Sequence, residues 1–514
     1  MLTKVYSAAI EGIAAFKVTI ETAVERGVRF SIVGMADTAV KESYQRMVSA
    51  MNQSGIKFPH RHTVINLAPA DVKKEGASFD LPMAIGVLAS NELVDHNNLA
   101  DYMITGELSL DGSVLPVKGA LPMAIKAREL KFKRLIVPAD NVTEAAVVNN
   151  IEVFGVRSLT EAVDLINGKS DLQPHVVDTR ALFARDADSF DFDFSEVKGQ
   201  EAVKRAFEVA CAGGHNILLI GSPGSGKSMM AKRLPSILPP LTMQEALETT
   251  KIHSVAGKLT RGSMLMTRRP FRTPHHTVSP VALVGGGTNP QPGEISLSNN
   301  GILFLDEFPE FSRQVLEVLR QPLEDREITV SRAKYTVTYP ASFMLVASMN
   351  PCPCGYYGHP TKPCTCSATQ VARYMNRISG PLLDRIDLQV EIQPVAFDDM
   401  ADTSPSESSE EIRARVVEAR AIQQERFRGE KGVYCNAQMN SRLLRAHAWP
   451  DAKGLAKLKE RMERLNMSAR AFDRILRVAR TIADLDRSPR VESRHIAEAI
   501  GYRSLDRSTF GQPV

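Results

Sequence analysis

The stretch that decides the fold is Gly221-Ser222-Pro223-Gly224-Ser225-Gly226-Lys227-Ser228, which follows the pattern G-x-x-x-x-G-K-[ST]. A short apolar run, Asn216–Ile220, precedes it and has the length of a buried parallel strand, whereas Met229–Leu234 can continue as a helix until Pro235. In this context of strand, glycine-rich loop and helix, backbone N–H groups surround a triphosphate. The pattern therefore predicts an ATP-binding loop in which Lys227 reaches the β- and γ-phosphates and Ser228 holds Mg²⁺.

Two further apolar runs end in polar side chains that suit the same site. The first, Gly301–Leu305, is followed by Asp306, placed to hold Mg²⁺, and by Glu307, placed to polarise the attacking water. The second, Phe343–Ser348, leads to Asn350, whose amide can orient that water. A solvated acidic turn and a loop-capping Asn are the alternatives. The combination with the glycine-rich loop favours a nucleotide-hydrolysing site.

Length and composition set the general class. The 514 residues allow two to four domains with full cores. The first residues are interrupted by acid too soon for a secretory signal, and no apolar run approaches the roughly 18 residues of a membrane span. We therefore expect a cytoplasmic protein with no membrane partner. Residues 411–514 hold 22 Lys and Arg against 13 Asp and Glu, which suggests a polyanion partner or simply a solvated basic face.

Shifts in composition predict an α/β protein in several parts. The expected parts are an α/β domain at 1–170, a linker at 171–190, a P-loop ATPase core at 191–395 with helices on both faces of a parallel sheet, an acidic Ser-rich linker at 396–410, and a basic helical lid at 411–514.

The front domain resembles the proteolytic domain of Lon proteases in Gly76-Ala77-Ser78-Phe79-Asp80 and in Thr105–Val117. Ser78 stands where that family has its nucleophile, but Leu121 stands where its catalytic lysine should be. A serine nucleophile needs a base. We therefore predict a non-proteolytic domain, with Lys118 and Lys126 as the alternative bases.

A histidine pair and a hairpin lie between the ATPase strands. His275 and His276 fall in a stretch rich in Gly and Pro, and are expected to be hydrogen-bonded loop residues rather than metal ligands. Residues 328–339 alternate β-branched side chains around a basic tip, which predicts a β-hairpin. Arg332 and Lys334 at this tip are either ordinary solvent-exposed loop residues or, in a ring ATPase, residues of a hairpin that projects into the pore and contacts phosphates.

Four cysteines form two C-x-C pairs. Thiolates in such pairs can close a tetrahedral Zn²⁺ site, and reduced thiols are the main alternative, ahead of a disulfide. The candidate ligands are Cys352, Cys354, Cys364 and Cys366.

Arginines near the end of the chain are candidate contacts of the γ-phosphate. Arg385 lies in Ser379–Asp387, on an expected surface turn, where it either forms an ordinary ion pair or reaches a neighbouring subunit as a finger. A helix capped by Ser468 places Arg470 and Arg474 on one face. This face is either simply solvated or, at the start of a lid helix, lets Arg470 contact the γ-phosphate of its own subunit.

The order of these parts resembles that of AAA+ ATPases. The stretches Arg272–Ser279, Pro292–Leu297, Asn300–Phe308 and Met349–Gly355 together resemble the YifB/ComM family of magnesium-chelatase-like ATPases. This resemblance implies a hexameric ring with ATP and Mg²⁺ between subunits. The residues that carry over are Lys227, Ser228, Asp306, Glu307, Asn350, Arg385 and Arg470.

The same resemblance implies a DNA-directed function. The leading hypothesis is a branch-migration helicase that acts on single-stranded and branched DNA, with a recombinase as a candidate partner, and integrates incoming strands during natural transformation. A magnesium-chelatase-like protein remodeller or metal-insertion ATPase is the first alternative, and an ATP-dependent Lon-like protease is the second.

Overall fold

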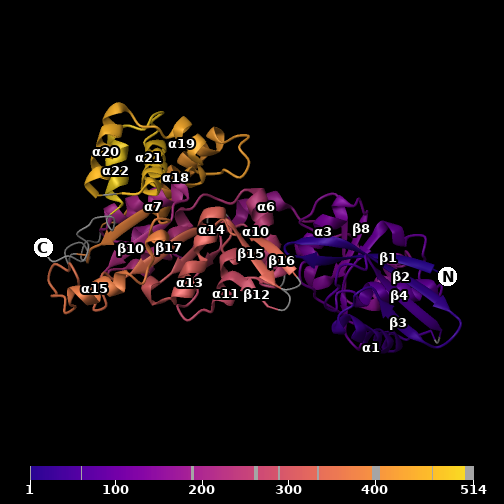
Figure 1. The fold of residues 1–514 in the computed structure, drawn as a ribbon. Helices are drawn as coiled ribbons and strands as arrows, with labels where there is room; N and C mark the ends of the chain where they lie inside the picture. Colours follow the sequence, from indigo (N-terminus) through magenta and orange to yellow (C-terminus); the bar gives the residue numbers. More distant parts are fainter. Residues whose placement is uncertain are drawn as a thin grey trace. The chain divides into compact units, whose positions relative to one another are not determined.

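The computed structural model describes residues 2–59, 61–186, 190–259, 264–287, 290–332, 335–395, 404, 406–465 and 467–503. The chain divides into two compact units (Figure 1). The first unit consists of residues 1–185, 243–267 and 290–292, and the second of residues 186–242, 268–289 and 293–514. No described helix is both long and apolar enough to span a membrane.

The first unit is built on a seven-stranded mixed sheet with the order β3-β4-β2-β1-β5-β8-β9. β1 and β2 form a long antiparallel hairpin, β2 pairs antiparallel with β4, and the other neighbours are parallel. The strands are β1 (Leu2–Glu11), β2 (Ala14–Glu25), β3 (Phe30–Val33), β4 (His62–Ala68), β5 (Tyr102–Ile104), β8 (Arg134–Pro138) and β9 (Glu152–Val156), with a separate small hairpin of β6 (Glu107–Leu108) and β7 (Val114–Leu115).

Two helices, α2 and α10, pack closely within the first unit. All residues of α2 (Asp80–Ser90) are buried, because its sequence is apolar around nearly the whole helix. α10 (Met243–Val255), although it follows the glycine-rich loop in the chain, packs against α3 (Ala120–Glu129), and its Ser254 hydroxyl donates to Glu144. The other helices are α1 (Thr38–Gln53), α4 (Val142–Ala145), α5 (Leu159–Ile166) and α6 (Thr179–Asp186), the last within the stretch expected to be a linker.

The second unit has a five-stranded parallel sheet with the order β11-β14-β17-β10-β18. Its three central strands are buried along their whole length, as continuous apolar runs predict for a parallel sheet covered on both faces. The predicted α/β fold is confirmed. The strands are β10 (Ile217–Gly221), β11 (Phe271–Arg272), β14 (Ile302–Leu305), β17 (Met344–Met349) and β18 (Leu388–Ile392).

One longer helix, α7, precedes the first of these strands, and shorter helices lie between the strands. They are α7 (Glu201–Gly213), α8 (Lys227–Ala231), α9 (Leu234–Ile237), α11 (Pro280–Val284), α12 (Glu294–Leu297), α13 (Arg313–Val318), α14 (Arg320–Asp325), α15 (Ala368–Met375) and α16 (Gly380–Leu383). The expectation of one helix up to Pro235 is wrong, because α8 ends at Ala231 and α9 then begins with Pro235 in its first turn, where proline needs no N–H partner.

The predicted helical lid forms the upper layer of the second unit in Figure 1, over α7. Lid residues Ile412 and Ile475 share one hydrophobic core with Phe207 of α7. The Ser468 hydroxyl accepts from the N–H of Ala471, which confirms the predicted helix start. The lid helices are α18 (Ser409–Arg426), α19 (Ser441–His447), α20 (Ala452–Leu465), α21 (Ala469–Leu485) and α22 (Ser493–Gly501).

An ion pair fastens α21 to the sheet. Asp387, just before β18, is buried and accepts from Arg474 Nη1 at 2.6 Å and from the N–H of Asn216 at 3.0 Å. Burial alone would raise the pKa of Asp387, but the Arg474 guanidinium outweighs it and holds that pKa well below its usual range.

Asp387→Asn is expected to lower the free energy of unfolding by about 3 kcal/mol, because a buried guanidinium loses its counter-charge. Urea unfolding followed by the fluorescence of Trp449, the only tryptophan, would measure this loss in the lid. A depressed pKa stabilises the fold above about pH 4 and loses that effect as pH falls further, so the difference from wild type should shrink in acid. Glu460→Gln on exposed α20 is the control, and an equal loss there would contradict the assignment.

Candidate nucleotide site

The carboxyl ends of three adjacent strands bring the predicted nucleotide-site residues together. Ile220 of β10 pairs with Met349 of β17, and Leu305 of β14 pairs with Ala347. The glycine-rich loop, the acidic turn and Asn350 therefore follow neighbouring strands at one edge of the sheet. Ligands bind at this edge in open α/β sheets.

The ammonium of Lys227 lies inside the glycine-rich loop, hereafter the P-loop (residues 221–228). It donates to the carbonyls of Gly221 and Ser222, both at 2.8 Å, and to Asn350 Oδ1 at 3.3 Å. Lys227 is only 9% exposed, and burial lowers the pKa of its amine although the charge of Asp306 opposes this effect. A buried cation with neutral oxygens as its direct partners is well placed to receive an anion such as a phosphate.

The loop keeps its shape partly because residue 221 is glycine. A Cβ at Gly221 would lie 2.7 Å from the carbonyl oxygen of Ile392 on β18, so a larger residue would push the two strands apart. Gly224 and Gly226 have positive φ angles of 80° and 86°, and nothing lies within 4 Å of a Cβ at Gly224. The backbone is thus open where a phosphate would approach.

The oxygen ligands expected for Mg²⁺ are gathered beside the P-loop. The Ser228 hydroxyl donates to Asp306 Oδ2 at 2.6 Å, and the Ser348 hydroxyl donates to Asp306 Oδ1. A hydroxyl and a carboxylate in contact, next to a phosphate cradle, form the ligand set that suits Mg²⁺ with nucleotide. These residues therefore fit the cation.

Glu307 lies at the surface of the site. Its backbone has a φ of 52°, in the left-handed region, and its N–H donates to Asp306 Oδ1 at 3.1 Å. Glu307 Oε2 is 3.4 Å from His276 Nδ1, and the His276 ring lies 4.0 Å from that of His275. The two histidines thus border the acidic turn, and His275 also bonds Thr277, so neither is isolated.

Ser348 is a site residue that sequence reasoning missed. It is buried within β17 and looks like one more residue of an apolar strand. The available signal was the register of the sheet, because pairing of Leu305 with Ala347 brings the next residues, Asp306 and Ser348, side by side.

Ser348→Ala is expected to raise the Mg²⁺ concentration needed for half-maximal ATP hydrolysis about tenfold, because partners that orient a metal ligand contribute 10- to 100-fold to metal affinity or activity. The measurement is the Mg²⁺ concentration that gives half-maximal ATP hydrolysis. Ser348→Thr keeps the hydroxyl and should stay near wild type. An unchanged Mg²⁺ requirement in Ser348→Ala would show that the hydroxyl does not orient Asp306.

The charges of the predicted arginines act on Glu324, at the end of α14. Arg385 forms an ion pair with Glu324, and the charges of Arg470 and Arg474 also help to lower the pKa of Glu324. Arg470 is exposed, whereas Arg474 pairs with Asp387. The expectation that Arg385 lies on a surface turn is wrong: it is 6% exposed, because it also donates to the carbonyl of Pro381.

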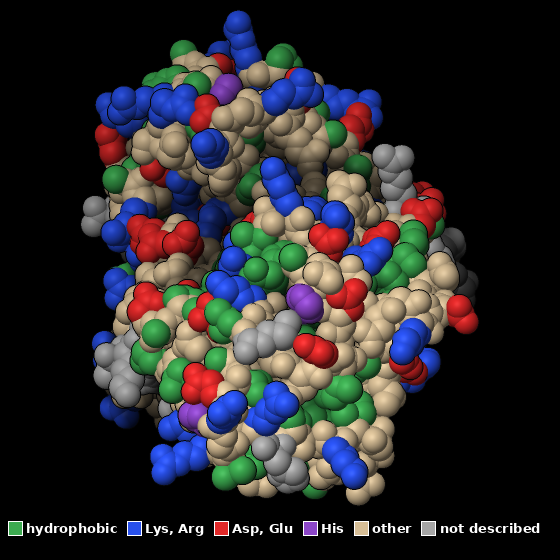
Figure 2. All heavy atoms as spheres, turned by 90° about the vertical axis from the view of Figure 1, so that its right-hand side faces the viewer, with side chains coloured by type: hydrophobic (Ala, Val, Ile, Leu, Met, Phe, Trp, Pro, Cys, Tyr) green, Lys and Arg blue, Asp and Glu red, His purple; other side chains and the backbone are tan. Residues whose placement is uncertain are grey.

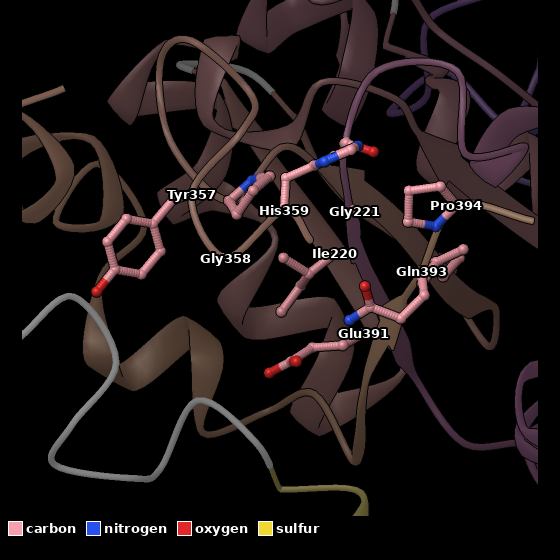
Figure 3. A pocket seen from close by; sticks show the side chains of 11 residues that line it. Ile220, Gly221, Tyr357, Gly358, His359, Glu391, Gln393 and Pro394 are labelled. Carbon is pink, nitrogen blue, oxygen red and sulfur yellow. The ribbon is translucent and has the colours of Figure 1, made fainter. Parts of the chain in front are cut away.

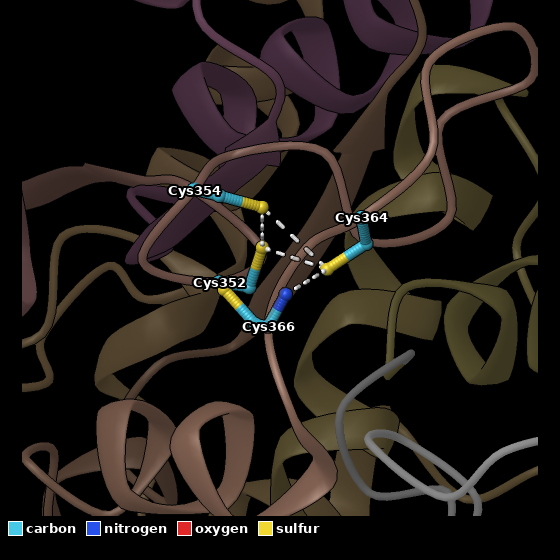
Figure 4. Close-up of side chains that lie close together, drawn as sticks. All are labelled: Cys352, Cys354, Cys364 and Cys366. Carbon is cyan, nitrogen blue, oxygen red and sulfur yellow. Dashed lines mark hydrogen bonds between the residues drawn. The ribbon is translucent and has the colours of Figure 1, made fainter.

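The four cysteines converge into one cluster (Figure 4). Cys352 Sγ lies 3.3 Å from Cys354 Sγ and 3.6 Å from Cys364 Sγ, and Cys354 Sγ lies 3.5 Å from Cys364 Sγ. All four sulfurs, including that of Cys366, lie within 4.8 Å of one another, and none forms a disulfide. Four thiolate sulfurs arranged as a tetrahedron, each about 2.3 Å from a zinc ion, would lie nearly as far from one another as these sulfurs do, so the cluster fits tetrahedral zinc.

The predicted hairpin is present as β15 (Glu327–Arg332) and β16 (Tyr335–Pro340), paired antiparallel. Lys334 lies outside the described residues, and for Arg332 only the backbone, at the end of β15, is described. Most of the acidic linker at 396–410 also lies outside the described residues.

The face of the molecule shown in Figure 2 carries basic and acidic side chains side by side.

The Lon-like residues of the first unit have different partners in the structure. Leu121 is fully buried, and its N–H donates to Glu144 Oε1 at 2.9 Å. Lys118 is exposed, and Lys126 pairs with Glu129 at 2.6 Å. The backbone carbonyl of Ser78 accepts from the N–H of Gly106 at 2.9 Å.

The parallel sheet, the P-loop and the Ser228–Asp306 pair define a P-loop ATPase of the AAA+ class. Three family models match most of the chain: "Magnesium chelatase, subunit ChlI" at residues 193–400, "Subunit ChlI of Mg-chelatase" at 20–141, and "Magnesium chelatase, subunit ChlI C-terminal" at 406–503. The chain belongs to the YifB/ComM family of magnesium-chelatase-like ATPases, as the following relatives show.

The relatives cover both parts of the chain. Competence protein ComM of Haemophilus influenzae is 40% identical over 510 residues, 98% of each chain. The protein YifB of Escherichia coli is 41% identical over 511 residues, again 98% of each chain. Lon protease 2 of Bacillus subtilis is 27% identical over 139 residues, 26% of this chain and 24% of its own, in keeping with a Lon-like domain.

Proposed function

We propose that this protein is an ATP-driven DNA motor, a branch-migration helicase that promotes integration of incoming single strands by homologous recombination during natural transformation. The observation that carries the proposal is the P-loop site, with Lys227 in the loop and Ser228 bonded to Asp306, in a chain that matches a competence protein over 98% of its length. Single-stranded and branched DNA in the cytoplasm would be its substrates, and a recombinase would be its partner.

The site residues divide the work of hydrolysis. Lys227 binds the β- and γ-phosphates of ATP, while Ser228 and Asp306 hold Mg²⁺, which when bound neutralises the charge of the phosphate oxygens. Glu307 polarises the attacking water and Asn350 orients it. Their arrangement at one sheet edge supports these roles.

Assembly into a hexameric ring would complete the site. Arg385 of one subunit would contact the γ-phosphate held by its neighbour, and Arg470, or Arg474 one turn further, would add a lid contact. The hairpin of β15 and β16 would face the pore, where Arg332 and Lys334 contact DNA phosphates. The four-cysteine cluster would hold one Zn²⁺ as a structural ion.

Single-stranded or branched DNA is expected to raise steady-state ATP hydrolysis severalfold at low salt. The stimulation should fall as salt rises, because phosphate contacts release counterions. The comparison is hydrolysis with and without each DNA at two salt concentrations, followed by strand-exchange assays on branched substrates. An ATP hydrolysis rate that no DNA changes would refute the proposal that the protein is a DNA motor.

In that case the protein would instead be a magnesium-chelatase-like protein remodeller or metal-insertion ATPase, which the three matching family models favour. A Lon-like protease has less support, because Leu121 occupies the lysine position and is buried.

A further inference from the structure

A pocket of about 160 Å³ opens beside the first residues of the P-loop. Three stretches line it: Ile220–Ser222 at the end of β10, Pro351 with Tyr357–His359, and Glu391–Pro394 at the end of β18. Figure 3 shows His359 beside Gly221, with Glu391 and Gln393 across the same space. Because Gly221 pairs with Ile392, the parallel sheet fixes one side of the pocket.

The lining suits the nucleoside part of a nucleotide. Ile220, Ile392 and Pro394 supply apolar surface, whereas Glu391 and Gln393 offer a carboxylate and an amide. Nucleotide and cofactor sites combine an apolar lining with a few polar groups in this way. Ser222 belongs both to this lining and to the P-loop, so a ligand with phosphates in the loop would have its next group at the pocket.

A second contact brings another segment to the rim. The side-chain amide of Gln200 donates to the carbonyl of Gln393 at 2.6 Å, which joins the start of α7 to the end of β18. The backbone at the lining residue Gln393 is therefore held by a segment 193 residues earlier in the sequence.

The remaining wall is part of the cysteine loop, here defined as residues 352–366. Tyr357 and His359 lie between the two cysteine pairs, so both ends of their segment are held at the sulfur cluster. The His359 ring also packs edge-on against Tyr356 with centroids 5.6 Å apart. Within the segment, the Nδ1 of His359 accepts from the N–H of Lys362 at 3.0 Å.

The cysteine loop is seated directly on the P-loop. A Cβ at Gly355 would lie 2.5 Å from Cδ of Pro223, and Gly355 has a φ of 86°. The loop also begins immediately after Asn350 and Pro351, and Asn350 bonds the Lys227 ammonium. Any shift of the cysteine loop would therefore move groups that contact the P-loop.

We propose that the cysteine loop, closed by a metal ion on its four thiolates, forms the wall of a pocket for the nucleoside of ATP, so that metal loading sets nucleotide affinity. This inference rests on the proposed binding of phosphates at the P-loop. Zinc is the metal that best suits four thiolates in a closed tetrahedron.

The test compares ADP with inorganic pyrophosphate, which shares its phosphates but has no nucleoside. Calorimetry on the full chain gives both affinities, and mass spectrometry gives zinc per chain. His359→Ala should keep its zinc and lose about tenfold in ADP affinity, the effect of one lost contact of about 1.4 kcal/mol, with pyrophosphate affinity unchanged. Cys364→Ser should lose zinc and lose at least as much ADP affinity. Arg373→Ala, exposed on α15, should change nothing.

The outcomes separate the two proposals. Failure of wild type to bind either probe would refute the P-loop assignment itself. Wild-type ADP affinity in zinc-free Cys364→Ser, or in His359→Ala, would refute the nucleoside wall alone. If Cys364→Ser does not fold, as judged by Trp449 fluorescence, removal of zinc from the wild-type protein by a chelator decides instead: it should weaken ADP binding and leave pyrophosphate binding unchanged, and unchanged ADP affinity would refute the role of the metal.

Discussion

Lys227→Ala is expected to reduce ATP hydrolysis by about 10²- to 10³-fold, the usual cost of removing one preorganised donor to phosphate charge. The structure gives the reason. The ammonium is nearly enclosed, its pKa is lowered by burial, and its direct partners are the carbonyls of Gly221 and Ser222 and the amide oxygen of Asn350. Phosphates bound in the loop would supply the negative charge that the direct partners of this buried cation do not provide.

Lys232→Ala is the matched control, because Lys232 follows the same helix and is exposed. It should keep wild-type hydrolysis. The measurement is phosphate release by purified protein, with ADP binding measured separately. Normal turnover by Lys227→Ala in a clean preparation would refute the assignment of the P-loop as the catalytic nucleotide site.

The central strands of the second unit could be predicted from the sequence, because a strand buried on both faces reads as a short apolar run with polar residues at its end. Asn216–Ile220 and Phe343–Ser348 were placed within one residue of β10 and β17. The residues that follow such strands meet at one sheet edge, so Asp306 and Asn350 could also be found.

Other features depend on contacts between distant residues, which local patterns do not contain. Ser348 looks like one more residue of an apolar strand, and its bond to Asp306 follows only from the pairing register of β17 with β14. Arg385 is buried and pairs with Glu324, 61 residues earlier, a contact that no local pattern contains. The packing of α10 against α3 likewise could not be inferred from the order of the sequence.

The surroundings of Glu324 are the most informative of these features, because Arg385 pairs with it and the charges of Arg470 and Arg474 also lower its pKa. The sequence offered them as separate contacts, a finger for the neighbouring subunit and a lid residue for its own. In the structure the charges of all three act on Glu324. Arg470 is exposed, whereas Arg385 is buried against Glu324 and Arg474 pairs with Asp387. Arg385 would therefore reach the phosphates of a docked subunit only by exchanging Glu324 for them.

Arg385→Ala is accordingly expected to lower hydrolysis by about 10³-fold or more, the contribution of an arginine finger, while ADP affinity stays near wild type. Glu324→Gln is the control: it breaks the ion pair but leaves the guanidinium, so hydrolysis should remain within a few-fold of wild type.

Mixing decides whether Arg385 acts on a neighbouring subunit. Arg385→Ala subunits keep Glu307, and Glu307→Gln subunits keep Arg385. If the guanidinium serves the adjacent site, mixed rings contain interfaces with both groups intact, and hydrolysis should rise above that of either variant alone. No rise at any mixing ratio, together with an equal loss in Glu324→Gln, would show that Arg385 acts only as the structural partner of Glu324 within its own chain.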